Sequence, residues 1–235
     1  MISRAALLLT LLSTVALFGA EEGFKSLFNG KDLTGWEGTP ELWSVEDGAI
    51  KGETTNEKKA KGNTFLVWRD GKTADFHLKC KFKLLGGNNS GVQYRSTETA
   101  KFVMTGYQCD LNYGAENMCK LYHEKNPRGR VCMAGEVVVY EASADGKKGA
   151  GKKVTGPTPE AEKLKTATKK DDWNEVEIIA KGNHVIHKIN GVVAIDFTDN
   201  DEKNRCMEGL LALQIHAGAP MTIYFKDIEF KELKN

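Results

Sequence analysis

Three strand-like segments carry pairs of polar side chains of the kinds that bind polar ligands or exchange protons. The two residues of each pair are separated by one position, so in an extended strand both point to the same face. The pairs are Gln93 with Arg95 in residues 91–95, Gln108 with Asp110 in residues 107–111, and Gln214 with His216 in residues 211–216. The spacing predicts a sheet with one apolar face and one polar face, the latter suited to a polar ligand with little or no charge.

Three members of these pairs have the most distinctive chemistry. Arg95 offers a planar set of donors suited to a carboxylate or to vicinal sugar oxygens, and a structural pairing with Asp110 or Glu124 is an equally good interpretation. Asp110 is the strongest acidic candidate, with a surface carboxylate at a strand end as the alternative. His216 precedes Gly218 near a predicted sheet rim, which makes it a candidate for proton transfer.

A second group of candidates lies at residues 122–130, after the predicted strand at residues 107–111. A histidine, a carboxylate and two arginines close together have the parts for acid–base chemistry or anion binding, although an ordinary charged loop is the commoner case. In an extended strand His123 and Glu124 point to opposite faces, so we do not expect them to act as a pair. Glu124 is therefore a catalytic candidate, and Tyr122, Arg128 and Arg130 are candidate ligand contacts.

Asparagine and tryptophan residues add further candidate contacts. Asn89 stands at the mouth of the first polar-faced strand, where it belongs either to the Gly- and Asn-rich turn or to a ligand site. Trp36 and Trp173 are candidate platforms for a sugar ring, but tryptophan more often belongs to the core or its rim. Of the two, Trp173 is the candidate substrate contact.

Several standard catalytic signatures are absent from the sequence. It contains no Gly-x-Ser-x-Gly elbow, no phosphate-binding loop and no His-Glu-x-x-His motif. The alternating carboxylates of a retaining jelly-roll glycosidase are also missing, which disfavours ordinary glycoside hydrolysis by two carboxylates. Lys and Arg number 33 against 32 for Asp and Glu, a formal net charge of +1. We therefore expect no nucleic-acid partner.

The N-terminal residues 1–20 have the features of a secretory signal peptide. Arg4 precedes an apolar run at residues 5–18 that is too short for a comfortable membrane span, and two small residues then precede two glutamates. An N-terminal membrane anchor is the alternative. We expect export to the periplasm or beyond, which leaves residues 21–235 as a single domain without a membrane span.

Five cysteines lie in the predicted domain. Cys80 alternates with apolar residues and is expected to be a buried apolar filler. Cys109, Cys119 and Cys132 are close enough in sequence for one disulfide among them, which an exported protein permits. The spacing does not determine the pairing, and the oligomeric state is not encoded in any pattern we find.

Strands dominate the predicted secondary structure. A tight type I′ turn is expected at Asn190 and Gly191, and a bulge or bend at Lys226 and Asp227. Between residues 141 and 172 the alternation stops, and we expect a long loop with one short helix near residues 159–165. Strands are expected over residues 76–84, 173–180, 184–189, 192–197 and 221–230. This pattern favours an all-β sandwich or jelly roll.

The order and spacing of seven short motifs together resemble the 3-keto-disaccharide hydrolase domain family. The resemblance covers essentially all of the chain after the signal peptide. The motifs are FKSLFNGKDLTGW (24–36), WSVEDGAI (43–50), NSGVQYR (89–95), GYQCD (106–110), DWN (172–174), NG (190–191) and LQIHAG (213–218). Many members carry Glu and Gln where this chain has Gln108 and Asp110, so it follows a second pattern within the family.

The resemblance implies a concanavalin-like jelly-roll β-sandwich of two antiparallel sheets with one short helix. It also implies action on a sugar whose 3-hydroxyl has been oxidised to a ketone. Such a ketone acidifies the C2 hydrogen, so the glycosidic bond breaks by elimination, which needs a base, an acid and enolate stabilisation. His216 would transfer the proton with Asp110 or Glu124 as partner. Arg95, Gln93, Gln108 and Gln214 would contact the sugar.

Two further expectations follow from the same residues. A divalent ion that polarises the 3-oxo group would find ligands in Asp110, Glu124 and His216, although the chemistry does not require one. A non-catalytic carbohydrate-binding module that uses the same polar face is the alternative function. A third possible function is an adhesion or scaffold domain whose polar faces are only solvated, because β-sandwich folds host all three kinds of protein.

Overall fold

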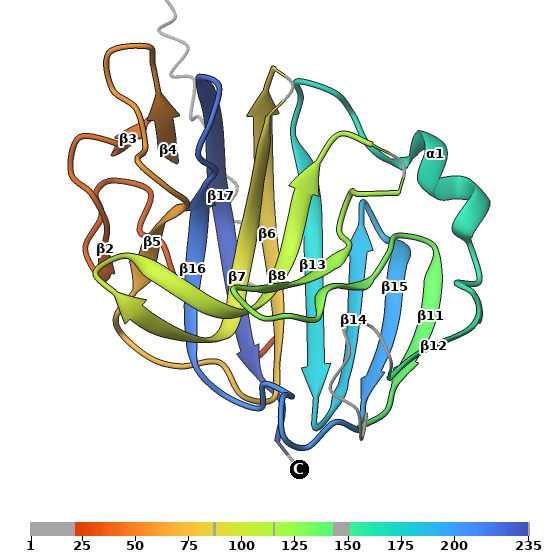
Figure 1. Ribbon diagram of the computed structural model, residues 1–235. Helices are drawn as coiled ribbons and strands as arrows, with labels where there is room; N and C mark the ends of the chain where they lie inside the picture. Colours follow the sequence, from red (N-terminus) through yellow and green to blue (C-terminus); the bar gives the residue numbers. More distant parts are fainter. Residues whose placement is uncertain (1–21, 87, 115, 143–150, 235) are drawn as a thin grey trace, which may run out of the picture.

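Two β-sheets stacked face to face make up this protein, seen here in a computed structural model (Figure 1). The structure describes residues 22–86, 88–114, 116–142 and 151–234. The predicted all-β sandwich with one short helix is confirmed. The predicted signal peptide at residues 1–20 lies outside the described residues. In the described ranges, no helix is long and apolar enough to cross a membrane.

Ten strands of the described chain form the larger sheet and seven form the smaller. The strands of the larger sheet are β1 (Lys25–Ser26), β3 (Trp43–Glu46), β4 (Ala49–Thr54), β6 (Phe76–Leu85), β11 (Glu136–Tyr140), β12 (Lys152–Pro157), β13 (Asn174–Lys181), β14 (His184–Ile189), β15 (Val192–Asp199) and β17 (Met221–Glu232). Those of the smaller sheet are β2 (Trp36–Glu37), β5 (Thr64–Trp68), β7 (Asn89–Ala100), β8 (Val103–Asn112), β9 (Leu121–Glu124), β10 (Gly129–Cys132) and β16 (Leu210–Ile215).

Neighbouring strands run in the order β12-β11-β15-β14-β13-β6-β17-β4-β3 in the larger sheet, with β1 beside β17. The smaller sheet has the order β10-β9-β8-β7-β16-β5-β2. The expectation of two purely antiparallel sheets is wrong at one place, because β11 and β15 pair in parallel. Strand β11 enters the larger sheet from β10 of the smaller one, so no tight hairpin sets its direction.

The strands predicted over residues 173–180, 184–189 and 192–197 are confirmed as β13, β14 and β15, which form an antiparallel meander. Its second turn has Asn190 at φ 48° and Gly191 at φ 81°, the two positive values that a type I′ turn requires. The predicted bend in the last strand is also present. Asp227 has φ 48°, and the register of β17 against β6 shifts between Lys226 and Glu229.

The segment expected to be one long loop contains a strand as well as a helix. Strand β12 pairs with β11 at the edge of the larger sheet, so the loop prediction is wrong there. Its residues are exposed or half-buried along the whole strand, which removes the apolar alternation that would reveal it. The predicted short helix is present as a 3₁₀ turn at Ala161–Lys163 followed by α1 at Leu164–Ala167.

The core lies between the sheets, where alternate residues of each strand are apolar and buried. Cys80 is fully buried there, which confirms the prediction that it fills apolar space. All five cysteines are free, so the structure contains no disulfide among Cys109, Cys119 and Cys132. Packing of two apolar sheet faces therefore holds the sandwich together without a covalent cross-link.

The β7–β8 hairpin curls over the outer face of the smaller sheet (Figure 1). At its tip the carbonyl of Phe102 accepts a hydrogen bond from the Phe65 amide of β5, 3.1 Å away. Arg69 forms a two-pronged ion pair with Glu98 of the hairpin, at 2.7 and 3.2 Å. The hairpin thereby covers the β5 side of this face and leaves the β8–β9 side open.

Candidate functional site

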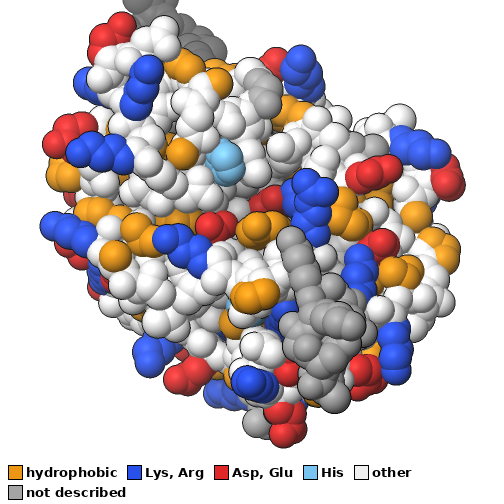
Figure 2. Space-filling view, viewed as in Figure 1, with side chains coloured by type: hydrophobic (Ala, Val, Ile, Leu, Met, Phe, Trp, Pro, Cys, Tyr) orange, Lys and Arg blue, Asp and Glu red, His pale blue; other side chains and the backbone are white. Residues whose placement is uncertain are grey.

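A hollow of about 220 Å³ lies on the outer face of the seven-stranded sheet. Figure 2 looks onto this face and shows histidine, acidic and basic side chains close together near its centre. The hollow is lined by Asn63, Asn89, Gln108, Asp110, Lys120, Tyr122, Glu124, Arg130, Gln214 and His216. The polar face predicted from the sequence therefore exists and is concentrated at one place.

Strand alternation places most of these side chains. On β8, Tyr107 and Leu111 are buried in the core between the sheets, so Gln108 and Asp110 point outward. The register pairs Gln108 with Tyr122 of β9, which brings two sugar-binding candidates side by side on adjacent strands. Side chains from five neighbouring strands, β10, β9, β8, β7 and β16, thus converge on one ligand-sized space.

Asp110 and Lys120 form a buried ion pair at this hollow. One carboxylate oxygen of Asp110 contacts the Lys120 ammonium, and the other accepts a hydrogen bond from Nε2 of Gln108 at 2.5 Å. The backbone fixes the pair as well, because the Asp110 amide donates to the Lys120 carbonyl at 3.1 Å. Both oxygens of Asp110 are therefore occupied by partners within the protein.

Glu124 is the second carboxyl group that lines the hollow. Burial raises the pKa of its carboxyl, and the nearby charge of Asp110 adds to the rise. A long hydrogen bond from Asn63, at 3.5 Å, and the charge of His216 act in the opposite direction. A carboxyl with a raised pKa holds its proton closer to neutral pH, which suits a general acid.

His216 lies half-buried at the rim of the hollow, just after β16. Its Nδ1 is 2.6 Å from the carbonyl oxygen of Ala217, which can only accept, so Nδ1 carries the proton. In the neutral ring the lone pair is therefore on Nε2. That nitrogen has no hydrogen-bond partner among the described residues, so it is available to accept a proton.

Side-chain amides with unpartnered buried atoms surround the acidic groups. Oε1 of Gln108, Nε2 of Gln214 and Oδ1 of Asn89 are buried and have no hydrogen-bond partner in the described chain. A Cβ on Gly91 would lie 2.6 Å from Cδ of Gln108, so only glycine leaves room for this amide. Buried donors and acceptors of this kind normally have a partner, so they are suited to hydroxyl groups of a ligand.

Tyr122 and Arg130 complete the open side of the hollow. Burial raises the pKa of the Tyr122 phenol, which keeps it a neutral hydrogen-bond donor. Arg130 is exposed, and in the described ranges its guanidinium has no ion-pair partner. These two side chains can contact the part of a ligand that extends out of the hollow.

The residues do not fit the divalent-ion site considered from the sequence. No group of three or more His, Cys, Asp or Glu side chains in the described part of the chain is arranged to hold a metal ion. Asp110, one of the three expected ligands, is instead engaged by Lys120 and Gln108. We therefore derive no step through a metal.

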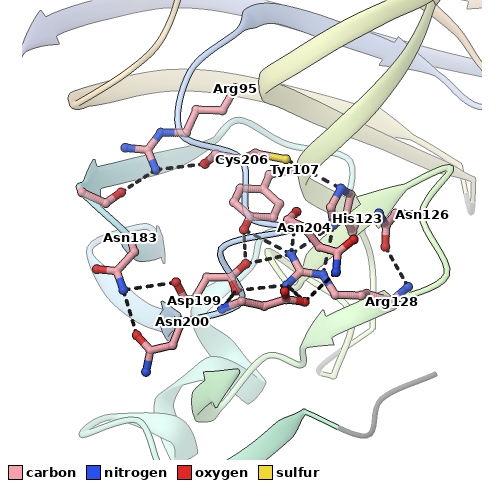
Figure 3. Close-up of polar contacts among 12 residues, drawn as sticks. Arg95, Tyr107, His123, Asn126, Arg128, Asn183, Asp199, Asn200, Asn204 and Cys206 are labelled. Carbon is pink, nitrogen blue, oxygen red and sulfur yellow. Dashed lines mark hydrogen bonds and ion pairs between the residues drawn. The ribbon is translucent and has the colours of Figure 1, made fainter. Parts of the chain in front are cut away.

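Arg95 does not reach the hollow, contrary to its predicted place. It has φ 46°, and the β7–β8 register shifts between Tyr94 and Thr97, which interrupts the alternation that the prediction assumed. Its guanidinium is buried elsewhere and donates to backbone carbonyls and to Asp75, in place of the Asp110 or Glu124 partner considered from the sequence. The carbonyl acceptors are Ala74, Gly182 and Cys206, the last drawn in Figure 3.

Arg128 is also outside the hollow. Its guanidinium forms a two-pronged ion pair with Asp199 at 3.0 and 2.7 Å, and it lies beside Tyr107 and His123 (Figure 3). All four side chains are buried. Burial lowers the pKa of His123 to about 3, so its ring is neutral. His123 and Glu124 do face opposite sides, as predicted, and only Glu124 belongs to the hollow.

Two further candidates lie away from the hollow. Trp173 precedes β13 on the other sheet, where the Lys226 ammonium is 4.1 Å from its ring centre and Lys83 is 5.3 Å away. Gln93 shares the face of Gln108 but is fully covered beside the hairpin, with both side-chain polar atoms unpartnered. Neither side chain lines the hollow.

Sequence reasoning missed two residues that do line it. Lys120 shares strand parity with Tyr122 but is a buried lysine within a run of apolar residues, so the polar-face pattern did not mark it. Asn63 lies in a loop before β5, where no periodicity exists to place it. Its amide oxygen accepts from the Ala217 amide at 3.1 Å, so Asn63 joins the His216 turn to Glu124.

Known proteins resemble this chain in sequence. The model of a 3-keto-alpha-glucoside-1,2-lyase-like domain matches residues 23–231. A 3-keto-disaccharide hydrolase of Bacteroides thetaiotaomicron is 32% identical over 84 residues. That match covers 33% of this chain and 29% of the relative, so it spans less than a third of the relative's length.

Solved structures share the fold. A candidate glycosyl hydrolase from Parabacteroides distasonis ATCC 8503 is 24% identical with a TM-score of 0.58, and the likeness covers 91% of this chain and 95% of that one. A second from the same organism is 19% identical with a TM-score of 0.59, over 89% and 99%. The carbohydrate-binding module CBM66 from Bacillus subtilis is 16% identical with a TM-score of 0.52, over 86% and 98%.

The two-sheet sandwich and the polar hollow on one outer face define a β-sandwich protein with a ligand-sized polar site. Since the family model covers most of the chain, the protein belongs to the 3-keto-alpha-glucoside-1,2-lyase-like family, which includes the 3-keto-disaccharide hydrolases. The resemblance found in the sequence motifs is thereby confirmed.

Proposed function

We propose that this protein is exported and cleaves the glycosidic bond of 3-keto-glycosides by elimination followed by hydration. The observation that carries the proposal is the composition of the hollow. A carboxyl whose pKa burial raises and a histidine with a free Nε2 stand in one ligand-sized space lined by unpartnered amides. The curated relative named as a 3-keto-disaccharide hydrolase supports the substrate class.

His216 is the base in this proposal. Its Nε2 takes the proton from C2, and the electron pair moves into a C2–C3 double bond while the C3 carbonyl oxygen becomes an enolate oxygen. The contact between Nδ1 and the Ala217 carbonyl fixes the tautomer and stabilises the imidazolium that forms. The ketone at C3 is what makes this proton removable, so an unoxidised glycoside is not a substrate.

Glu124 is the acid. As the enolate re-forms the C3 carbonyl, a C1–C2 double bond forms and the bond from C1 to the leaving oxygen breaks. Glu124 gives its proton to that oxygen, which its raised pKa favours. Water then adds across the double bond. Its oxygen bonds to C1 as a hydroxyl while Glu124 takes one of its protons, and the imidazolium of His216 returns a proton to C2, so both side chains regain their starting states.

The amides hold the sugar in place for these steps. Gln108, Gln214 and Asn89 each present a buried polar atom without a partner, and pyranose hydroxyls supply both donors and acceptors. A hollow of about 220 Å³ suits one sugar ring, with the rest of the glycoside toward Tyr122 and Arg130. Holding the reacting ring in one orientation is itself a large part of catalysis.

A non-catalytic carbohydrate-binding module is the second candidate function. The structural likeness to CBM66 favours it, since that module shares the sandwich over 86% of this chain. The same hollow would then bind the sugar through its amides without proton transfer. The two functions differ in whether bound glycoside is broken.

Turnover separates the two functions. The purified chain is incubated with a 3-keto-glucoside that carries a chromogenic leaving group, with and without a chelator, and with the unoxidised glucoside as control. Release from the 3-keto substrate alone, lost in His216→Ala while the variant remains folded, is the expected result. Binding by calorimetry without release identifies a binding module, and neither binding nor release contradicts both proposals.

A further inference from the structure

We propose that Lys120 is the catalytic electrophile of this site, and that its ammonium donates a hydrogen bond to the C3 oxygen as that oxygen becomes an enolate. This inference rests on the proposed elimination and adds a residue that the family resemblance did not supply. It assigns a chemical role to a buried charge that the polar-face pattern of the sequence did not reveal.

Lys120 and Asp110 form an ion pair that is costly to bury. The side chains of Lys120 and Asp110 are only 6% and 5% exposed. Removing two charges from water costs free energy that their attraction barely repays, and apolar replacements of such pairs are often as stable. A buried pair at the wall of a ligand-sized hollow is therefore poorly explained by stability and is typical of a functional site.

Lys120 is also the cation best placed to meet a ligand inside the hollow. Among the described residues that line the hollow, Lys120 is the buried cation, whereas Arg130 is exposed at the open side. An ammonium has three N–H donors, and Asp110 is its one ion-pair partner in the described chain. Donors therefore remain for a ligand oxygen in the hollow.

Hydrogen bonds around the ion pair hold the Lys120 ammonium in one position. Asp110 is held by Gln108 at 2.5 Å, and its backbone amide is bonded to the Lys120 carbonyl at 3.1 Å. The ammonium is thus fixed before substrate arrives. At rest the pair is neutral overall, which suits an uncharged ketone. When C2 loses its proton to His216, the negative charge appears on the C3 oxygen, and a fixed cation in a water-poor site stabilises it strongly.

The step is balanced without any added reagent. The C2–H bond breaks and its proton goes to His216, while its electron pair forms the C2–C3 double bond. The π electrons of the ketone move onto oxygen, which accepts a hydrogen bond from Lys120 and takes no proton from it. Collapse of the enolate returns these electrons and expels the glycosidic oxygen, which is protonated by Glu124.

A probe without a leaving group isolates this step. The 3-keto derivative of 1,5-anhydroglucitol has hydrogen in place of the glycosidic oxygen at C1, so it can form the enolate but has no glycosidic oxygen to expel. Exchange of its C2 hydrogen for deuterium in D₂O, followed by NMR, reports enolate formation alone. Release from the chromogenic 3-keto-glucoside is measured in parallel and reports enolate formation together with departure of the leaving group.

The matched variants are Asp110→Asn and the double variant Asp110→Asn with Lys120→Met. The double variant removes both charges, so no unpaired charge is left buried and folding is expected. Loss of one preorganised oxyanion donor typically slows a reaction by about 10² to 10³. We expect exchange in the double variant to be slower than in Asp110→Asn by that factor.

Equal exchange rates in these two variants overturn the role of Lys120. If Asp110→Asn does not fold, the single variant Lys120→Gln, which keeps Asp110, is compared with the wild-type protein instead. An exchange rate in Lys120→Gln equal to that of the wild type also overturns the inference. Failure of the proposed function has a different signature. In that case the wild-type protein itself neither exchanges the probe nor releases the chromophore.

Discussion

The hydroxyl of Tyr94 donates a hydrogen bond to Nε2 of His187, 2.8 Å away, in the interior between the two sheets. On the other side of the ring, Nδ1 is 2.8 Å from the carbonyl oxygen of Cys119 and must donate to it. The ring is therefore neutral, and burial lowers its pKa to about 4. Cys119 immediately precedes Lys120, so a histidine of the larger sheet supports the segment that delivers Lys120 to the hollow.

Acid is predicted to destabilise the protein through His187. In the unfolded chain His187 takes up a proton near pH 6.5, whereas in the folded chain it stays neutral until about pH 4. The contribution of the neutral ring to the free energy of unfolding is therefore fully present above about pH 6.5 and is lost as the pH falls from there to about pH 4. The full loss for this group is on the order of 3 kcal/mol. Urea unfolding from pH 7 to pH 4 measures it.

His187→Gln is expected to flatten that pH dependence, because glutamine keeps a donor for Cys119 and an acceptor for Tyr94 but does not titrate there. Part of the slope remains, since burial lowers the pKa of His123 as well. The same substitution at the partly exposed His184 controls for the exchange itself. An unchanged slope in His187→Gln contradicts the assignment.

Two arginines close in sequence are predicted to behave oppositely when truncated. Arg128→Met leaves Asp199 buried without its partner and should cost about 3 to 5 kcal/mol of the free energy of unfolding. Arg130→Met removes an exposed cation and should change stability by less than about 0.5 kcal/mol while weakening binding of a 3-keto-glycoside. Thermal unfolding and substrate titration of both variants test this. Equal effects on stability contradict the placement of the two side chains.

The sequence could predict the site wherever strand alternation is regular. Gln108, Asp110 and Gln214 lie on uninterrupted stretches of β8 and β16, and the period-two pattern placed all three correctly. Arg95 sits at a bulge with positive φ, and no local signal marks that change of direction. Asn63 reaches the hollow from a loop, through a chain reversal that only the tertiary fold defines.

The strands of the fold were likewise predictable where burial alternates along them and were missed where it does not. Strands with one face toward solvent, such as β6 and β13, were recognised because burial alternates along them. Strand β12 was missed because an edge strand without a buried face has no alternation to detect. Tight turns were predictable from Asn190 and Gly191 because their side chains permit positive φ.

Trp173 is predicted to have no part in substrate binding. It lies against Lys83 and Lys226 before a strand of the sheet that does not carry the hollow. Trp173→Ala should therefore leave KM for a 3-keto-glycoside within about two-fold, whereas Tyr122→Ala, which removes a wall of the hollow, should raise KM by about ten-fold or more. Steady-state kinetics of the pair decide it. A larger KM increase in Trp173→Ala would move the binding surface to the other sheet.

Glu124→Gln is predicted to separate stability from activity. Because burial raises the pKa of Glu124, the folded protein favours the protonated carboxyl. Glu124 therefore destabilises the fold progressively as the pH rises from the pKa of this carboxyl in the unfolded chain toward its higher pKa in the folded protein. The loss of stability persists at neutral pH. Glutamine mimics the protonated form, so the variant should unfold at a higher temperature at pH 7, with the gain disappearing below about pH 4. Glu41→Gln, at an exposed position, controls for the substitution.

The activity of the same variant identifies the acid. Without a proton donor, release of a poor leaving group such as a sugar alcohol should fall by about 10² to 10⁴, because general acid catalysis contributes that much. Release of a nitrophenolate, which departs without protonation, should fall far less. Exchange of the C2 hydrogen should continue, since proton removal is assigned to His216 and precedes the step that Glu124 assists. Loss of exchange in Glu124→Gln would instead make Glu124 the base and reverse the two roles.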